Sequence, residues 1–276
     1  MRAFLGRVLF GRRSLRSSMP MLPSGATLAI GLSSNPVALV GGSVWPMAAA
    51  LCTHLLKHHR HIFAAPGRST IELGSGTGTV GLFAAGLGAR CILSDQRPAR
   101  AAAQPVSYAP DGASSIDLNE LAGVSDCLLD LMRSNVARNE ASFAVRPLVI
   151  ELDYTDSAHV GSAARASPGA RGFSLLLGAD ITYSMNQHAP LARAIARLLS
   201  KEEQGEGEGG ALALIAHETR RSLTGTDVQL ESFVAAAAAA GLTCDVSPLP
   251  VPDAGSSGSL VELRWASRAR GACQIR

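Results

Sequence analysis

The chain has 276 residues, a length that suits one large domain or two small ones. With 47% hydrophobic and 17% charged residues it has enough apolar material for a core, which excludes a wholly disordered chain. No apolar run reaches the ~18–20 residues of a membrane-spanning helix, which argues against an integral membrane protein. The formal net charge is only +3, but residues 1–71 contain no Asp or Glu, whereas the 22 acidic and 17 basic residues from Glu72 onward leave a net charge of −5.

The acid-free front begins with residues 1–18, which contain five Arg and three Ser and have apolar residues that can share one helical face. This composition fits an organelle transit peptide, and it equally fits a disordered tail. The basic residues are not interleaved with aromatic residues and the rest of the chain is acidic, so we expect no nucleic-acid partner. The expected location is the cytoplasm, or a mitochondrion or plastid if this segment is a transit peptide.

Five cysteines are scattered along the chain without a CxxC pair, so a zinc cluster has no support. Such dispersed cysteines are typical of an intracellular protein with reduced thiols.

Two short β-type runs, ATLAI at 26–30 and PVALV at 36–40, flank turn-forming residues and predict a hairpin. A helix follows from Pro46, because Met47, Leu51 and Leu55 recur every four residues.

The same predicted helix carries His54, His58 and His61 at helical spacing. Such spacing can bind a metal ion, but no carboxylate lies nearby in the sequence, so we expect no metal site.

From residue 69 short apolar runs alternate with helical segments. Predicted strands lie at 69–73, 90–95, 147–152, 173–180, 211–216, 243–247 and 259–265, and predicted helices near 79–87, 126–139, 189–199 and 228–240. Near-continuous apolar strands indicate a parallel sheet covered on both faces. The last two strands have no helix between them and must pair antiparallel.

The predicted fold is therefore an α/β, doubly wound, mostly parallel seven-stranded sheet ending in an antiparallel pair. This Rossmann-like arrangement is typical of class I methyltransferases. We expect residues 1–25 to be separate from one domain at 26–276, with a surface insertion at 97–125 and an acidic loop at 200–210.

The sharpest local signal is IELGSGTGTVG, in which Gly74, Gly76 and Gly78 follow a strand and precede a helix. Glycines there allow a tight turn and a close approach of ligand to backbone. Asp95, at the end of the next strand, can accept hydrogen bonds from two ribose hydroxyls.

Dinucleotide binding is the rival interpretation, because Gly76, Gly78 and Gly81 fit GxGxxG. That fingerprint begins at the strand end, however, and in that register Thr79 replaces the third glycine. Glu72 at the strand end repels a pyrophosphate but suits a cationic ligand such as S-adenosylmethionine, which we favour.

Several stretches, in order, resemble the family 16 protein-lysine methyltransferases, the DxxY group of seven-strand class I enzymes. They are GGSVWPMA with Trp45, IELGSGTGTVGLFAAGLGA, ILSDQ with Asp95, LMRSNVARN with Asn135 and Asn139, and LLLGADITY with Ala179, Asp180 and Tyr183. The sequence departs from the family after the third strand, where LDYTD replaces Leu-x-Trp-Gly. Tyr154 then takes the place of the tryptophan that packs on adenine, and Asp153 is a further partner for the adenine amino group.

The resemblance implies S-adenosylmethionine-dependent methylation of a lysine in a protein substrate, by a chain that we expect to be monomeric and without a membrane partner. Asp180 and Tyr183 are the catalytic candidates, one to hold the incoming amine and one to line its channel. The cofactor-binding candidates are Trp45, Glu72, Gly74, Ser75, Gly76, Gly78, Asp95, Asp153, Tyr154 and Ala179. Methylation of a histidine or a small-molecule amine, and a silent binding protein of the same fold, remain alternatives.

Overall fold

The structure is a computed structural model that describes residues 19–32, 41–63, 68–97, 127–201, 210–222, 225–252, 256–266 and 274–275. Segment 1–18, the run at 36–40, nearly all of the predicted insertion at 97–125 and most of the loop at 200–210 lie outside these ranges. Within the described ranges no helix is both long enough and apolar enough to cross a membrane.

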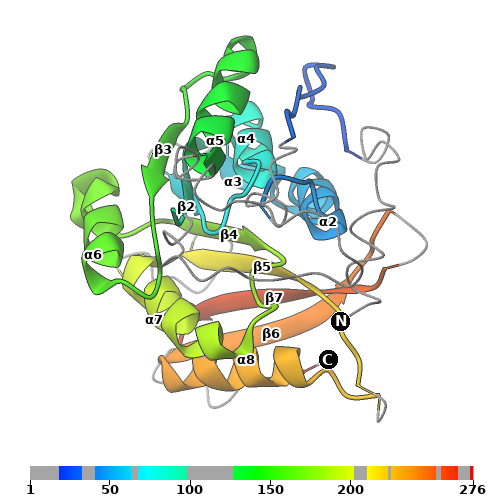
Figure 1. Cartoon of the computed structure of the whole chain (residues 1–276), viewed down its shortest axis with the longest axis vertical. Helices are drawn as coiled ribbons and strands as arrows, with labels where there is room; N and C mark the ends of the chain where they lie inside the picture. Colours follow the sequence, from blue (N-terminus) through cyan, green and yellow to red (C-terminus); the bar gives the residue numbers. More distant parts are fainter. Residues whose placement is uncertain are drawn as a thin grey trace, which may run out of the picture.

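One mixed sheet forms the centre of the molecule (Figure 1), with strands in the order β3-β2-β1-β4-β5-β7-β6-β8. The strands are β1 (Ser69–Glu72), β2 (Arg90–Asp95), β3 (Leu148–Glu151), β4 (Leu175–Ala179), β5 (Leu212–Glu218), β6 (Leu242–Leu249), β7 (Gly258–Trp265) and β8 (Gln274–Ile275). The first five pair in parallel, and β7 runs antiparallel to both β5 and β6. This confirms the predicted doubly wound sheet with an antiparallel end, to which the structure adds the two-residue β8, paired with β6.

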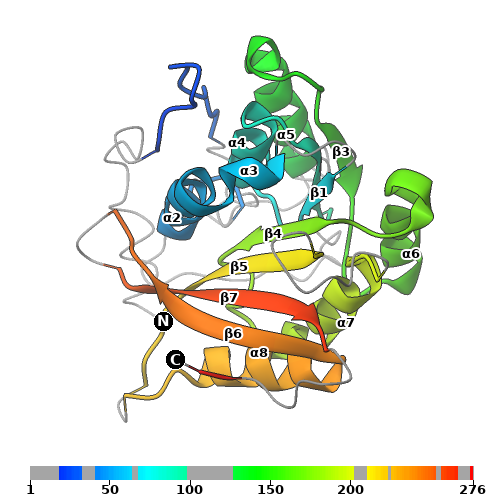
Figure 2. The same cartoon turned by 180° about the vertical axis from the view of Figure 1, so that it is seen from behind.

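Helices cover both faces of the sheet (Figures 1 and 2). On one face lie α2 (Pro46–His54), η3 (Leu55–His59), α3 (Arg60–Phe63), α4 (Thr79–Gly86) and α5 (Cys127–Arg138). On the other lie α6 (Ser157–Ala166), α7 (His188–Leu198) and α8 (Val228–Ala239). Short 3₁₀ turns are η5 (Glu140–Ser142), η6 (Pro168–Ala170) and η7 (Met185–Gln187).

The sheet divides the core in two, because successive side chains of a strand point to opposite faces. On β4, Leu175 and Leu177 pack with α2 and α4, whereas Leu176 packs with α6, α7 and α8. Strands buried on both sides read as continuous apolar runs, which is why their positions were predictable from the sequence.

The predicted helix starts and ends are largely confirmed. Pro46 is the first residue of α2, and the backbone at Gly241 has φ of 84° just beyond α8. Helix α6 was not predicted, since its sequence SAHVGSAARA lacks a strong apolar period. Asp156 would have marked the start of this helix in the sequence, because its carboxylate caps the helix by accepting hydrogen bonds from the N–H groups of Ala158 and His159.

The predicted N-terminal hairpin is wrong in its described half, because residues 26–32 form no strand. Their backbone bonds instead to two side chains of α5 and its end. Asn139 binds both the N–H and the C=O of Ala29, and Asn135 does the same for Gly31. The amides thus replace the partner strand that a β-type sequence would otherwise need.

Candidate functional site

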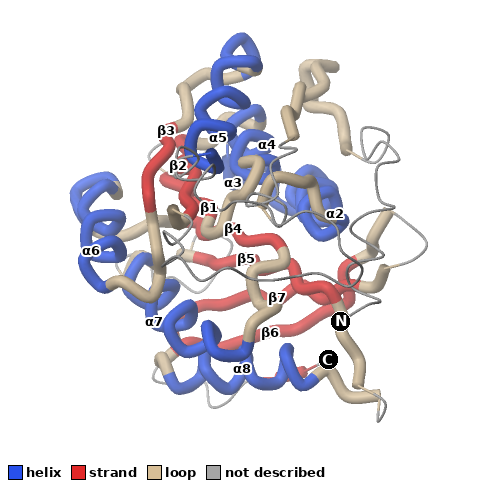
Figure 3. The backbone as a smooth tube through the Cα atoms, in the orientation of Figure 1, coloured by secondary structure: helices blue, strands red, loops and turns tan. Residues whose placement is uncertain are grey.

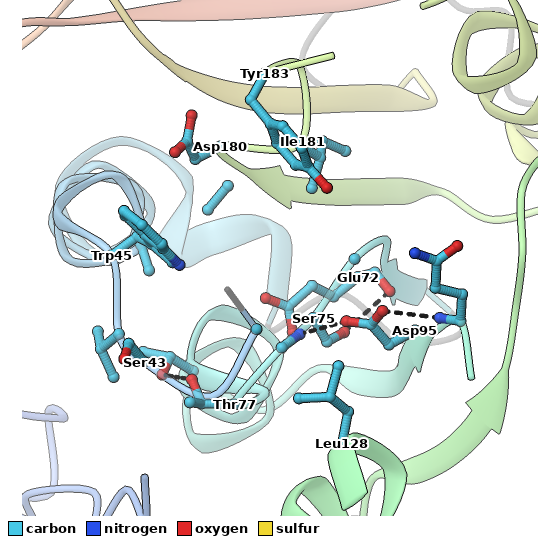
Figure 4. A pocket seen from close by; sticks show the side chains of 18 of the residues that line it. Ser43, Trp45, Glu72, Ser75, Thr77, Asp95, Leu128, Asp180, Ile181 and Tyr183 are labelled. Atoms are coloured by element: carbon cyan, nitrogen blue, oxygen red, sulfur yellow. Dashed lines mark hydrogen bonds between the residues drawn. The ribbon is translucent and has the colours of Figure 1, made fainter. Parts of the chain in front are cut away.

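A cavity of about 290 Å³ opens at the carboxyl ends of β1, β2 and β4. In an open α/β sheet this edge is where ligands bind, at the point where the strand order reverses. Figure 4 shows Trp45, Asp180 and Tyr183 on one side of this space and Glu72 and Asp95 on the other. The predicted residues that line the cavity are Trp45, Glu72, Gly74, Ser75, Gly76, Asp95, Tyr154, Ala179, Asp180 and Tyr183.

The loop after β1 is held in a conformation that favours glycine. Gly74 and Gly76 have φ of 57° and 53°, and a Cβ on Gly76 would lie 2.6 Å from the carbonyl oxygen of Gly41. Gly78 also has positive φ, but it does not line the cavity, and its missing side chain makes room for Leu93 and Met132. Gly78 therefore allows the turn into α4, and its contact with a ligand stays a prediction.

Asp95 closes the side of the cavity at the end of β2. Its Oδ2 accepts from the N–H of Gly76 at 2.7 Å, and its Oδ1 accepts from the N–H of Gln96 at 2.8 Å. Burial raises the pKa of Asp95 to about 6, although the two N–H donors favour the carboxylate. Each oxygen still has lone pairs for a hydroxyl pair, as a ribose would present.

Glu72 is almost fully buried beneath the loop, with 2% of its surface exposed. Its Oε2 accepts from the N–H of Gly81 in the first turns of α4 at 2.9 Å. Burial raises the pKa of Glu72 to about 8, so at pH 7 the group holds a proton. The Glu72 side chain therefore holds α4 against β1. A protonated carboxyl group attracts a cationic ligand less than the carboxylate expected from the sequence.

Tyr154 lines the cavity after β3, where its hydroxyl donates to Oε1 of Gln187 at 2.6 Å. This hydrogen bond fixes the ring and leaves its face as a stacking surface. Asp153 does not line the cavity: its Oδ1 accepts from both the N–H and the hydroxyl of Thr155. The predicted contact of Asp153 with a ligand is therefore not supported by its placement.

Asp180 lies directly after β4 with φ of 55°, a left-handed conformation that is rare outside glycine. Both of its oxygens accept from Nη2 of Arg220, at 2.7 and 2.8 Å, and the same nitrogen lies 3.2 Å from Oε2 of Glu218. Burial raises the pKa of Asp180, and the Arg220 guanidinium acts in the opposite direction. Two carboxylates thus share one cation, which leaves one excess negative charge beside the cavity.

Arg220 was missed by sequence reasoning, because it follows β5 and no motif marks it. Arg220 contacts Asp180 but does not line the cavity; the lining residues that were missed are Gly41, Ser43, Val44, Ala48, Thr77, Thr79, Gln96, Leu128, Leu152 and Ile181. Most are neighbours of predicted residues, so extending each motif by one or two positions would have found them.

A buried polar network fixes the segment between Asp180 and Tyr183. The hydroxyl of Thr182 lies 2.7 Å from Nδ1 of His217 on β5, and Nε2 of His217 lies 2.9 Å from Oδ2 of Asp227. The same Oδ2 accepts from the N–H of Arg220. Thr182 and His217 have no exposed surface, so the network positions the loop and does not itself meet a ligand.

The charge of the cavity wall distinguishes between kinds of ligand. Among the described residues that line it, Glu72, Asp95 and Asp180 are acidic and none is Lys, Arg or His. This wall offers a pyrophosphate no cationic side chain, and its carboxyl groups suit a neutral or cationic ligand better.

Comparisons with known proteins agree with this architecture. Residues 27–109 match the family model described as Lysine methyltransferase. Among solved structures, the [4+2]-cyclase SpnF is 13% identical with a TM-score of 0.51 over 95% of this chain and 94% of its own. At that identity the likeness concerns the fold alone.

Two further solved structures have TM-scores below 0.5 and carry no weight here. One is magnesium protoporphyrin IX methyltransferase from Synechocystis PCC 6803 with bound SAH, which is 10% identical with a TM-score of 0.47 over 85% of this chain and 89% of its own. The other is the glycopeptide N-methyltransferase MtfA with S-adenosyl-L-methionine, which is 12% identical with a TM-score of 0.46 over 75% of this chain and 86% of its own.

The match to the family model contains Trp45, the glycine loop and Asp95, three of the features that form the cavity. Over residues 27–109, therefore, the chain is similar to the lysine methyltransferases, the family that its motifs resemble, and its sheet is doubly wound with an antiparallel end.

Proposed function

We propose that the chain transfers a methyl group from S-adenosylmethionine to a lysine side chain of a protein. The observation that carries this proposal is that one cavity gathers residues from motifs far apart in the sequence. Trp45, the glycine loop, Asp95, Tyr154 and Asp180 all face it.

The residues of the cavity fit the cofactor by their chemistry. The Asp95 carboxylate suits two ribose hydroxyls, the Tyr154 ring offers a face to adenine, and the wall without basic side chains tolerates a sulfonium and an ammonium. When bound, the cofactor supplies a methyl group on a positively charged sulfur, which is already a good leaving group. The protein has mainly to align the reactants and keep water out.

The amine would enter beside Asp180 and Tyr183. Tyr183 lines the cavity and is 41% exposed, so its ring connects the pocket with the surface and can contact a cationic side chain. The excess negative charge of the Asp180–Arg220–Glu218 cluster favours an incoming ammonium. Once that ammonium has lost a proton to solvent, Asp180 can accept a hydrogen bond from the amine and so orient its lone pair toward the methyl.

The engagement of Asp180 by Arg220 also supports a second candidate, a protein that binds the cofactor without accepting a lysine. In that case Arg220 occupies the acceptor that the substrate needs. The two candidates agree on cofactor binding and differ in methyl transfer, so they can be separated experimentally.

The test is to incubate the purified chain and a lysate of its source organism with cofactor carrying a labelled methyl group. Label on a protein, mapped to a lysine by mass spectrometry, is the expected result. Label on another residue or on a small molecule would favour a different nucleophile, and no label with intact cofactor affinity would favour the silent protein.

A variant links the activity to the site. We expect Asp180→Asn to lower turnover by about 100-fold or more while changing cofactor affinity, measured by calorimetry, less than about threefold. Asp130→Asn is the matched control, because Asp130 also pairs with an arginine, Arg133, but is exposed on α5 and does not line the cavity, so turnover should not change. Normal turnover by Asp180→Asn would remove Asp180 from the mechanism.

A further inference from the structure

A cluster of two histidines and a glutamate lies outside the cavity, between the helix that begins after Trp45 and strand β7. His54, His59 and Glu262 each offer one ligand atom, and these atoms all lie within 4.8 Å of one another. None of the three lines the cavity, so the proposed methyl transfer does not use them.

A change in helix type brings the two histidines together. Residues Leu55–His59 form a π-helix, whose turn is wider than that of an α-helix and places residues five apart on nearly the same face. Nε2 of His59 therefore lies 3.1 Å from Nε2 of His54, and one ring donates a hydrogen bond to the other. His58 and His61, which regular α-helical spacing would group with His54, are not part of the cluster.

The glutamate comes from the sheet and not from the sequence neighbourhood. Along β7, Leu260 packs with α2 and α4, whereas Val261 and Leu263 pack on the other face. Glu262 is two residues after Leu260, so its side chain lies on the same face of the sheet, toward α2 and the histidines. The start of α2 also lies against β7, since a Cβ on Gly258 would contact Met47.

The distance between the two nitrogens suits a shared ion. Zinc binds imidazole nitrogen at about 2.0–2.1 Å, so two nitrogens on one tetrahedral zinc ion are about 3.3 Å apart. We propose that His54, His59 and Glu262 form a binding site for a divalent transition-metal ion such as Zn²⁺, which fastens α2 and η3 to β7.

The charges around the cluster are mixed. Arg264 lies two residues along β7, with its Nη2 3.9 Å from Oε2 of Glu262, and it opposes a cation. Asp245, paired with Glu262 across β6 and β7, favours one. Because 3.9 Å is a loose ion pair on a partly exposed surface, Glu262 can exchange Arg264 for a metal ion at low cost.

The test uses the full chain stripped of metal with EDTA and titrated with Zn²⁺ in a non-chelating buffer by calorimetry. We expect one ion per chain. His59→Asn and Glu262→Gln should each weaken binding by about 10-fold or more, in the range typical of lost ligands and their supports. His58→Asn is the matched control, because the His58 ring lies 4.7 Å from that of His54 but outside the cluster, and it should change affinity less than twofold.

Absence of Zn²⁺ binding would overturn the proposal. So would a larger loss in His58→Asn than in Glu262→Gln, because that pattern indicates an ordinary pair of histidines one α-helical turn apart. Should a variant fail to fold, the wild-type chain gives a second measurement: Co²⁺ bound to the cluster should show the strong visible bands of a four-coordinate ion, and weak octahedral bands would contradict it.

Discussion

Gly76 shows how closely the loop after β1 packs on the segment before α2. Because a Cβ would lie 2.6 Å from the Gly41 carbonyl oxygen and φ is 53°, a side chain there must displace backbone. We expect Gly76→Val to abolish measurable cofactor binding by calorimetry. Gly25→Ala is the matched control: φ is 80° but a Cβ meets nothing within 4 Å, so only the conformational cost of about 1–2 kcal/mol applies. Equal cofactor affinity in Gly76→Val and wild type would contradict the loop assignment.

Glu72 gives a prediction about stability and pH. Its pKa of about 8 in the folded chain is above its ordinary value of 4.5, so the folded state holds this proton more tightly than the unfolded state does. The resulting stabilisation is complete below about pH 4.5 and is lost as the pH rises to about 8. Glu72→Gln cannot ionise, and its Oε1 can still accept from Gly81.

We therefore expect Glu72→Gln to melt at least about 2–4 °C above wild type at pH 9, the shift that ~1 kcal/mol gives, and close to wild type at pH 4.5. The exposed Glu140→Gln serves as the control and should show no such difference between the two pH values. A Glu72→Gln melting temperature that tracks wild type across the range would show that burial does not perturb this group.

At the scale of single residues, the sequence predicted those site residues whose place follows from the course of the backbone. Asp95 ends β2 and Asp180 directly follows β4, and strand ends could be read from the apolar runs. It failed where side-chain partners decide which way a residue points. Asp153 bonds to Thr155 two residues on, and Arg220 reaches Asp180 across 40 positions.

At the scale of elements, periodicity predicted each helix with a strong apolar stripe and each strand of the sheet except the two-residue β8. It could not show that Asn135 and Asn139 would hold residues 26–32 in place of a hairpin partner, since that requires knowing which face of α5 the segment meets. It also could not foresee the π-turn at Leu55–His59, because all sequence patterns for a helix assume 3.6 residues per turn.

The network of Thr182, His217 and Asp227 joins the loop after β4 to β5 and to the start of α8. Thr182→Val keeps the shape of the side chain but leaves Nδ1 of the buried His217 without its partner, which we expect to cost about 1–3 kcal/mol of unfolding free energy. Turnover should fall more than cofactor affinity, because the loop carries Asp180 and Tyr183.

Two variants test that assignment in denaturant titrations and kinetics. Thr182→Ser keeps the hydroxyl and should restore most of the turnover. Thr243→Val removes a longer 3.3 Å hydrogen bond on β6, remote from the cavity, and should leave turnover unchanged. A Thr182→Ser variant as impaired as Thr182→Val would show that packing of the methyl group, and not the hydroxyl, matters.

At the scale of the whole molecule, the cavity is where the parts on the two sides of the sheet meet. Figure 3 shows the strands in red between helices in blue on either side. Residues just before α2 and residues after β1, β3 and β4 together line the cavity. Trp45 lines the cavity directly before α2, a helix of one core, whereas Tyr154 packs against the other core. A ligand there contacts both cores, so its binding should stabilise the fold as one unit rather than a single loop.

This predicts a cofactor-dependent shift of the single thermal transition. At 100 times the dissociation constant, binding to the folded state adds about 2.7 kcal/mol, which in a chain of this size raises the melting temperature by about 5–10 °C. S-adenosylhomocysteine should give this shift at pH 7.5, and NAD⁺ should give none, because no described lining residue is basic.

Near pH 5 the shift should shrink, since Asp95, with a pKa of about 6, then holds a proton and loses acceptor capacity for the ribose hydroxyls. Gly76→Val should show no shift with either compound. An equal shift with NAD⁺ would mean that the acidic wall does not select the ligand.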